Sequence, residues 1–125
     1  MKLQPDQSDV QSISGYGPGW VGVNGEKITR SVIITSGGAR LDWAVDRFED
    51  LGADHFAQLA LVEAEVVIFG SGSRIRFPDA AWLRPLIARR IGVETMDTAA
   101  ACRTYNILAQ EGRSVAVALL LEQPA

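Results

Sequence analysis

The chain has 125 residues, of which 47% are hydrophobic and 22% charged, and its formal net charge is −3. This length suits one domain with one buried core, and the acidic balance gives no electrostatic reason to expect nucleic acid or an anionic membrane as a partner. A single cysteine excludes an internal disulfide and favours the cytoplasm as the compartment. The longest apolar run, 115–121, is too short to span a bilayer, and residues 1–9 lack the apolar region of a secretory signal.

The N-terminal third predicts an antiparallel β-meander. Residues 10–16 suit a strand that ends at the turn Gly17-Pro18-Gly19. A hairpin is then expected at Asn24-Gly25, because a type I′ turn needs positive φ at both central positions. The strand after it is expected to continue to residue 35, with the β-branched run 31–35 facing the core.

The middle of the chain predicts a connection, a helix and a buried strand. Residues 39–52 read as an irregular, charged connection whose isolated apolar side chains plug onto the core. Asp54 is the expected N-cap of a helix that ends near Val62. The uninterrupted apolar run 66–69 is typical of a strand buried on both faces, and Gly70-Ser71-Gly72 ends it.

A second helical segment opens at Pro78-Asp79. Because Pro85 cannot sit deep inside a helix, we expect a short turn through Leu83 followed by the main helix, or a kink near Arg84. Gly92 is expected to end this helix. Its inward face is expected to carry Leu83, Leu86, Ile87 and Ile91.

The stretch from residue 93 to Arg113 predicts a strand, a capped helix and a sharp stop. Residues 93–96 form the strand, and Asp97 or Thr98 caps a helix that reaches about Glu111. Gly112 stands where a left-handed residue ends a helix. The buried stripe of this helix is expected to contain Ala101, Cys102, Tyr105, Leu108 and Ala109.

These elements, with a last strand at 115–121, indicate the fold class. A meander followed by β-α-β-α-β is typical of an α/β domain with a mixed central sheet. We expect one such domain over residues 10–122, with flexible tails at 1–9 and 123–125.

Five blocks of sequence resemble, in order and spacing, a conserved family of unknown function. They are Phe69-Gly70-Ser71-Gly72, Arg76-Phe77-Pro78, Ile91-Gly92-Val93-Glu94-Thr95-Met96-Asp97-Thr98, Ala101-Cys102-Arg103-Thr104-Tyr105-Asn106 and Glu111-Gly112-Arg113. The family includes mitochondrial NADH dehydrogenase (complex I) assembly factor 3 and the adipogenesis-associated protein of animals. The chain looks like the bacterial members of the family. The resemblance implies a three-layer β+α/β/α fold around a mixed five-stranded sheet. No catalytic residues are assigned in the family, so the resemblance implies none here.

The residues themselves form no catalytic or metal-binding set. Gly70-Ser71-Gly72 lacks the third glycine of a dinucleotide fingerprint, since Ile75 stands there, so a tight strand exit is the better interpretation. His55 has no readable partner and suits the first turn of a helix. One histidine and one cysteine are too few for a metal site, and we expect no cofactor.

Two helix residues invite a functional interpretation beside a structural one. Cys102 lies near a helix N-terminus and beside Arg103, which would lower its pKa, but it also falls on the inward face, where burial makes it inert; we favour burial. Asn106 is unusual in mid-helix and either hydrogen-bonds neighbouring backbone, which we favour, or lines a polar pocket.

We therefore predict a non-catalytic protein-binding or assembly module with a protein partner. The alternative is a small-molecule or anion-binding protein, or even an enzyme, with a polar pocket near 70–72 and 97–106. The arginines of residues 73–113 outnumber the acids there by seven to four, which would suit an acidic partner or a phosphate-bearing ligand if they converge. The candidate binding residues are Gly70, Ser71, Gly72, Arg74, Arg76, Thr98, Arg103, Tyr105, Asn106 and Arg113.

Overall fold

The computed structural model describes residues 10–123. The expected tails at 1–9 and 123–125 lie outside the described residues except for Gln123, whose Nε2 donates to the carbonyls of Gly19 and Thr29 and so ties it to the domain. In chain order the strands are β1 (Ile13–Gly17), β2 (Trp20–Val23), β3 (Glu26–Ile28), β4 (Val32–Thr35), β5 (Arg40–Asp42), β6 (Val66–Gly70), β7 (Gly92–Met96) and β8 (Val115–Leu119). The α-helices are α1 (Ala53–Leu59), α2 (Arg84–Ala88) and α3 (Thr98–Gln110), and two short 3-10 helices are η2 (Phe48–Asp50) and η3 (Ala80–Leu83).

A mixed five-stranded sheet with the order β5-β4-β8-β6-β7 forms the middle layer. β6 pairs in parallel with both β7 and β8, whereas β4 pairs antiparallel with β8 and β5. The prediction that the strands at 66–69, 93–96 and 115–121 share one sheet, with the first two parallel, is confirmed. A helix crosses between consecutive parallel strands, as such a connection requires.

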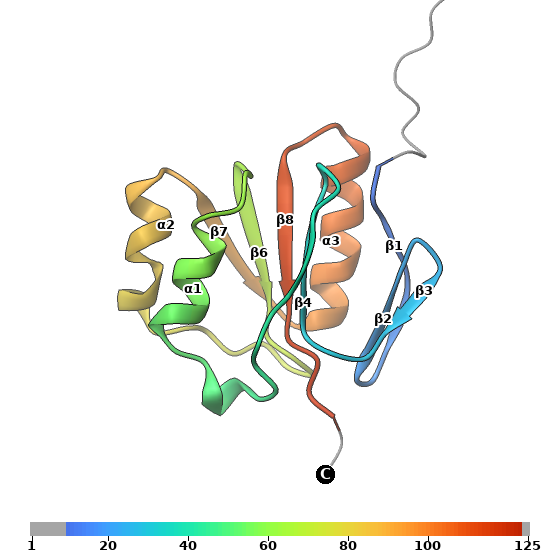
Figure 1. Ribbon diagram of the computed structural model, residues 1–125, viewed down its shortest axis with the longest axis horizontal. Coiled ribbons are helices and arrows are strands. Elements are labelled where there is room, and N and C mark those ends of the chain that lie inside the picture. Colours follow the sequence, from blue (N-terminus) through green and yellow to red (C-terminus); the bar gives the residue numbers. More distant parts are fainter. Residues whose placement is uncertain (1–9, 124–125) are drawn as a thin grey trace, which may run out of the picture.

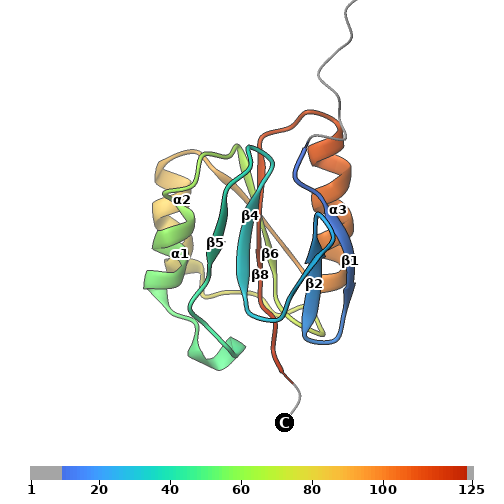
Figure 2. The ribbon, with the colours of Figure 1, turned by 45° about the vertical axis from the view of Figure 1, so that its right-hand side comes forward.

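Each face of this sheet is covered by a different layer (Figures 1 and 2). α3 and the small antiparallel sheet β1-β2-β3 pack on one face, and α1 and α2 pack on the other. Neighbouring residues of β4 show the division: Ile34 joins the core under α3, while Ile33 joins the core under α1. The predicted α/β class with a β+α/β/α layering is therefore confirmed.

The predicted Asn24-Gly25 hairpin is confirmed. Both residues have positive φ, at 50° and 89°, and Val23 pairs with Glu26 across the two-residue turn. The meander, however, stops at β3. The β-branched run 31–35 does not continue it but enters the central sheet as β4, because its side chains are buried on both faces and a half-exposed outer strand could not cover them.

The connection at 39–52 is less irregular than expected. It contains the edge strand β5 and the 3-10 helix η2. β5 escapes prediction because all three of its residues are exposed, so it carries no alternation of apolar and polar positions. The expectation that isolated apolar residues of this connection plug onto the core is confirmed by Trp43 and Leu51, both buried.

The start of α1 differs from the prediction. Gly52, not Asp54, is the N-cap, and its N–H donates to Nδ1 of His55 at 3.0 Å. His55 thus lies in the first turn, as expected, where its ring takes over the capping role. The helix ends at Leu59 rather than near Val62.

Pro85 divides the next segment as predicted, with η3 before it and α2 beginning around it. Two expectations here were wrong. Ile87 is 65% exposed rather than inward-facing. Arg90, not Gly92, is the left-handed residue after α2, with φ of 59°, because the N–H groups of Arg90 and Ile91 bond back to the carbonyls of Ile87 and Leu86 in a Schellman motif.

α3 follows the prediction closely. Asp97 caps it by accepting the N–H of Ala100 at 2.8 Å, and Gly112, with φ of 82°, follows its last turn. The inward stripe is buried as expected, with Leu108 half-buried at its margin.

Candidate functional site

The predicted Gly-Ser-Gly turn and the predicted helix cap meet at one edge of the central sheet. Because β6, β7 and β8 are mutually parallel, their carboxyl ends lie together, at the lower edge in Figure 1. Ligands of open α/β sheets are commonly bound at such an edge. Ser71, Gly72, Arg76 and Thr98 from the predicted set are brought together here.

Gly72 and Thr98 hold this edge closed by reciprocal hydrogen bonds. The Gly72 N–H donates to Oγ1 of Thr98 at 2.8 Å, and the Thr98 N–H donates to the Gly72 carbonyl at 2.8 Å. The Thr98 hydroxyl in turn donates to the carbonyl of Leu120 at 3.0 Å. The segments that follow β6, β7 and β8 are thereby tied to one another.

Ser71 and Arg76 form a second set of internal bonds. The buried Ser71 Oγ accepts the Arg76 N–H at 2.9 Å and lies 2.8 Å from the Arg74 carbonyl, to which it donates. The Arg76 guanidinium donates to the Ser71 carbonyl and pairs with the carboxylate of Glu122. It also lies over the Phe48 ring, 4.6 Å from its centroid, which favours an attractive cation–π contact.

Gly70 allows α3 to approach β6 closely. A Cβ at this position would lie 3.1 Å from Cβ of Ala101 and 3.1 Å from Cδ2 of Leu119, so that these neighbours would have to shift by a few tenths of an ångström. Packing therefore favours glycine at this position, whatever the function of the edge.

The remaining predicted residues are dispersed. Asn106 pairs with the backbone of Ile13 in β1, its Oδ1 accepting the N–H and its Nδ2 donating to the carbonyl, both at 2.8 Å. Tyr105 donates its hydroxyl to the carbonyl of Gln11 at 2.6 Å. The favoured interpretation of Asn106 was a hydrogen bond to the backbone of a neighbouring loop. The bond to backbone is confirmed, but the partner, Ile13, belongs to the strand β1 and not to a loop.

The other arginines do not join Arg76. Arg103 donates to the Tyr16 hydroxyl at 2.8 Å, whereas the side chains of Arg74 and Arg113 are exposed. Within residues 10–123, no buried side-chain nitrogen or oxygen lacks a hydrogen-bond partner. The buried polar groups of the predicted site are thus used within the chain.

An open cleft of about 690 Å³ lies just outside the closed edge. The β1–β2 turn, the start of α3 and the segment 120–123 line it. Of the predicted residues, Gly72 and Thr98 line it. Its charged lining residues are Arg47, Asp97 and Glu122.

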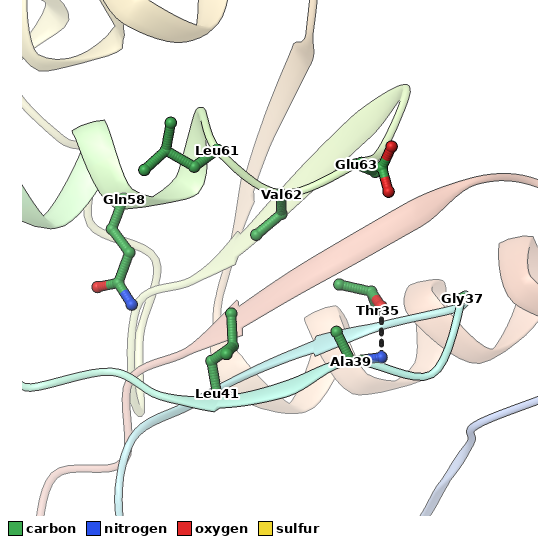
Figure 3. A pocket seen from close by; sticks show the side chains of 8 residues that line it. All are labelled: Thr35, Gly37, Ala39, Leu41, Gln58, Leu61, Val62 and Glu63. Atoms are coloured by element: carbon green, nitrogen blue, oxygen red, sulfur yellow. Dashed lines mark hydrogen bonds between the residues drawn. The ribbon is translucent and has the colours of Figure 1, made fainter.

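A second cleft, of about 480 Å³, lies between the β4–β5 hairpin and the end of α1 (Figure 3). Leu41 and Leu61 enter it from opposite sides, and Thr35 Oγ1 accepts the Ala39 N–H at its floor at 2.9 Å. No residue of the predicted set lines this cleft.

Sequence reasoning missed the contribution of Glu122. Its carboxylate accepts the N–H of Phe48 at 2.9 Å and pairs with Arg76, so it joins three segments far apart in the chain. A signal was present: Glu122 is an acid directly after a buried strand that runs parallel to the strand before Gly70-Ser71-Gly72. Parallel strands place their following residues at the same edge.

The structure bears on the chemistry of the one thiol. Cys102 is fully buried, and burial raises its pKa to about 12, against the smaller lowering by Arg103.

Among the described residues, 10–123, no cluster of three potential metal ligands occurs. In the same part of the chain no helix has the length and apolar character to cross a membrane.

The three-layer β+α/β/α domain is a known class of structure. The chain is similar to the crystal structure of a Bordetella parapertussis protein, with 39% identity, a TM-score of 0.84 and coverage of 90% of this chain and 97% of the other. It is also similar to the solution structure of a Bordetella pertussis protein described as a Mth938-like domain, with 33% identity, a TM-score of 0.83 and coverage of 100% and 95%.

Residues 13–120 match the family described as "Protein of unknown function (DUF498/DUF598)", and the chain belongs to this family. Human NADH dehydrogenase [ubiquinone] 1 alpha subcomplex assembly factor 3 is 29% identical over 120 residues, which cover 94% of this chain and 65% of that protein. The chain therefore spans about two thirds of the length of this relative. The family resemblance expected from the five sequence blocks is confirmed.

Proposed function

We propose that the chain is a non-catalytic protein-binding module that acts as an assembly factor for other proteins. The observation that carries the proposal is the relationship, across 94% of the chain, to a protein named as an assembly factor. The human protein's name refers to assembly of an NADH dehydrogenase; for this chain only the general role, contact with partner proteins during their assembly, is proposed.

The geometry of the sheet edge supports this role. The residues expected to bind a ligand bond mainly to one another and to the backbone, as Gly72 with Thr98 and Ser71 with Arg76 illustrate. Such an arrangement stiffens a scaffold, and a stiff scaffold loses less conformational entropy when a partner binds to its surface. We propose a cytoplasmic location for the chain, as expected from its single, buried and unpaired cysteine.

The proposal is tested by affinity purification of the tagged chain from its native host, with mass spectrometry of proteins and of metabolites in the same eluate. We expect one or a few proteins that co-elute with the chain in a stoichiometric complex on size-exclusion chromatography. A bound metabolite without any stoichiometric protein would contradict the proposal. The tagged chain carrying Gly70→Trp, which cannot pack, controls for binding to unfolded protein.

The cleft of about 690 Å³ favours a second candidate, a small-molecule-binding protein, since its volume lies in the usual range for such sites. Its charged lining side chains are Asp97, Glu122 and Arg47. Because Arg47 already pairs with Asp50 and Glu122 with Arg76, a neutral molecule would suit the cleft better than the small anion expected from sequence. Ala99→Trp should fill the cleft and abolish any ligand found in the eluate, whereas Gln110→Trp, far along α3, should not.

A further inference from the structure

We infer that residues 73–90 form the surface that binds the partner, and that the partner presents an acidic segment with large apolar side chains. This inference rests on the proposed function and adds to it the binding surface and the chemistry of the partner. Residues 73–90 comprise the loop after β6, the 3-10 helix η3 and the helix α2, and are called the basic-apolar segment below. Figure 1 shows the segment, in yellow and gold, running from the lower end of β6 to α2 at the left of the view.

The charge of the basic-apolar segment is opposite to that of the whole chain. It contains five arginines and one acid, Asp79, in a protein whose net charge is −3. Arg76 is neutralised by Glu122. The other four are exposed and form no salt bridge with any residue in the described range, 10–123; they are Arg74, Arg84, Arg89 and Arg90.

Three large apolar side chains are exposed within the same stretch. Ile75 is 51% exposed, Phe77 is 70% exposed and Ile87 is 65% exposed. Single exposed apolar residues are ordinary, but aromatic and apolar side chains interspersed with arginines are the composition enriched in protein-binding surfaces.

The inward side of the segment is firmly anchored, which fixes the direction of the outward side chains. In the loop, Arg76 is held by the Ser71 carbonyl and Glu122. In η3, Trp82 stacks on Phe56 with ring centroids 5.7 Å apart, and in α2 Leu86 is fully buried.

On α2 the residues opposite Leu86 point outward. Arg84, Ile87 and Ala88 stand at i, i+3 and i+4, one face of the helix, and all three are exposed. The Schellman motif at Arg90 fixes the end of the helix, so the last two arginines extend from an ordered backbone. A surface that is ordered before binding costs little entropy to bind.

The chemistry of the surface specifies an acidic partner with apolar side chains. Guanidinium groups form strong, often bidentate hydrogen bonds with carboxylates, and exposed Phe77 and Ile87 gain free energy only if apolar atoms cover them. Nucleic acid would satisfy the arginines but not these apolar side chains, and its phosphates would meet a chain with three more acids than bases. A protein segment that carries both acidic and apolar residues satisfies both groups.

The test uses the full chain and a library of random linear peptides displayed on phage as the probe. We expect the selected peptides to be enriched in Asp or Glu together with Leu, Ile, Phe or Trp. Phe77→Ser and Arg84→Glu should each weaken binding of the selected peptides by roughly tenfold or more, the size typical of a central contact. Binding should also weaken as salt is raised, because exposed charges contribute to it.

Matched controls are available on α3 and just after it. Ile107 is 59% exposed and Arg113 is exposed. Arg113→Glu makes the same change as Arg84→Glu, and Ile107→Ser, like Phe77→Ser, replaces an exposed apolar side chain by serine. Because both controls lie outside the segment, they should leave binding within twofold. Amide NMR spectra of each variant should retain the native pattern. Peptide addition should shift resonances of residues 73–90 rather than those of α3.

Three results of the peptide experiment would overturn the inference: selection of no peptides, selection of peptides without acidic enrichment, or binding that is equally sensitive to the control substitutions. Binding to phosphatidylglycerol vesicles or double-stranded DNA that is stronger than to the peptides and lost in Phe77→Ser would assign the surface to a membrane or nucleic acid instead. If a stoichiometric partner is purified from the host but binds Phe77→Ser and Arg84→Glu normally, the proposed function stands and this surface is wrong. If no partner is found, both fail.

Discussion

At the scale of single residues, two opposing effects act on the thiol of Cys102. The start of α3 and the neighbouring guanidinium of Arg103 favour the thiolate, while removal from water disfavours it. Desolvation is the larger effect and raises the pKa to about 12. In a solvent-accessible site, a cysteine near a helix start would be reactive. Here the thiol is buried, so its position near the helix start does not make it reactive.

Cys102 should therefore resist thiol reagents in the folded protein. We expect a disulfide reagent at neutral pH to label it only in denaturant, and rapid labelling of the native protein would contradict this interpretation. Cys102→Ser, which buries a hydroxyl, should lower the free energy of unfolding by about 1–3 kcal/mol, measured by urea denaturation. Any activity should be unaffected.

The same raised pKa predicts how stability changes with pH. Above the ordinary thiol pKa of 9.0 the unfolded chain loses the proton while the native protein keeps it, so stability present below pH 9.0 is lost as pH rises toward about 12. The slope from this group is at most about 1.4 kcal/mol per pH unit. Burial also raises the pKa of Tyr105, which adds in the same direction. Cys102→Ala should show a shallower decline in urea midpoints over this range.

Gly70 illustrates a residue whose identity is set by contact. Gly70→Ala places a Cβ 3.1 Å from Ala101 and Leu119, and we expect a loss of about 1–3 kcal/mol in the free energy of unfolding from overpacking. Gly37→Ala is the matched control, because its new Cβ would meet only Thr35 Oγ1 at 3.9 Å. Equal effects of the two substitutions in thermal or urea unfolding would refute the packing argument.

At the scale of elements, α3 joins the two sheets. One side packs on the central sheet through Cys102 and Ala109. Asn106 holds the backbone of Ile13 in β1, and Tyr105 holds the carbonyl of Gln11, two residues before that strand. The Asn106 amide hydrogen-bonds the backbone of Ile13 as a paired strand would, offering one acceptor for its N–H and one donor for its carbonyl. The small sheet is thereby attached to the helix by hydrogen bonds as well as by apolar contact.

Removing this link should loosen the small sheet selectively. Asn106→Ala leaves the N–H and carbonyl of Ile13 without their partner, which should cost about 1–3 kcal/mol. Amide hydrogen exchange should accelerate in β1–β3 more than in β6–β8. Gln110→Ala, on the exposed side of the same helix, is the control and should change neither region. A uniform acceleration across all strands would show that the two sheets do not open separately.

At the scale of the whole molecule, Glu122 connects the loop after β6, the segment before α1 and the residues after β8. It accepts the Phe48 N–H and pairs with Arg76, and both charged side chains are partly shielded from water. A shielded pair matters more than a surface one because removing one partner leaves the other charge desolvated.

Glu122→Gln should therefore lower the free energy of unfolding by about 1–3 kcal/mol, measured by urea denaturation. Because Arg76 anchors the basic-apolar segment, the same substitution should also broaden amide NMR signals of residues 74–77. Asp42→Asn is the matched control, since its pair with Arg30 is exposed, and it should cost well under 1 kcal/mol. Similar losses in both variants would mean that the Arg76–Glu122 pair has no special role.

Local patterns in the sequence determined much of the fold. Asn24-Gly25 predicted its turn, Pro85 the division before α2, and Asp97 with Gly112 the ends of α3, because each depends on a few neighbouring residues. The apolar run at 66–69 predicted a buried strand of a largely parallel sheet, and the run at 115–121 predicted another strand of the same sheet, for the same reason. The family resemblance, on which the proposed assembly role rests, also came from the sequence.

Tertiary structure decided what depends on residues far apart. The extended pattern at 26–35 predicted one continuous strand of the meander, and only pairing with β8 showed that β4 belongs to the central sheet. The candidate site was expected as one pocket, yet Asn106 faces β1 and Arg103 faces Tyr16, because the direction of a helical side chain has meaning only once the neighbouring layers are placed. Glu122 acquired its two partners through contacts 46 and 74 residues away in the chain. Local conformational preferences depend on a few neighbouring residues, whereas burial and long-range pairing depend on the whole fold. The candidate site is built from burial and long-range pairing, so only the tertiary structure could define it.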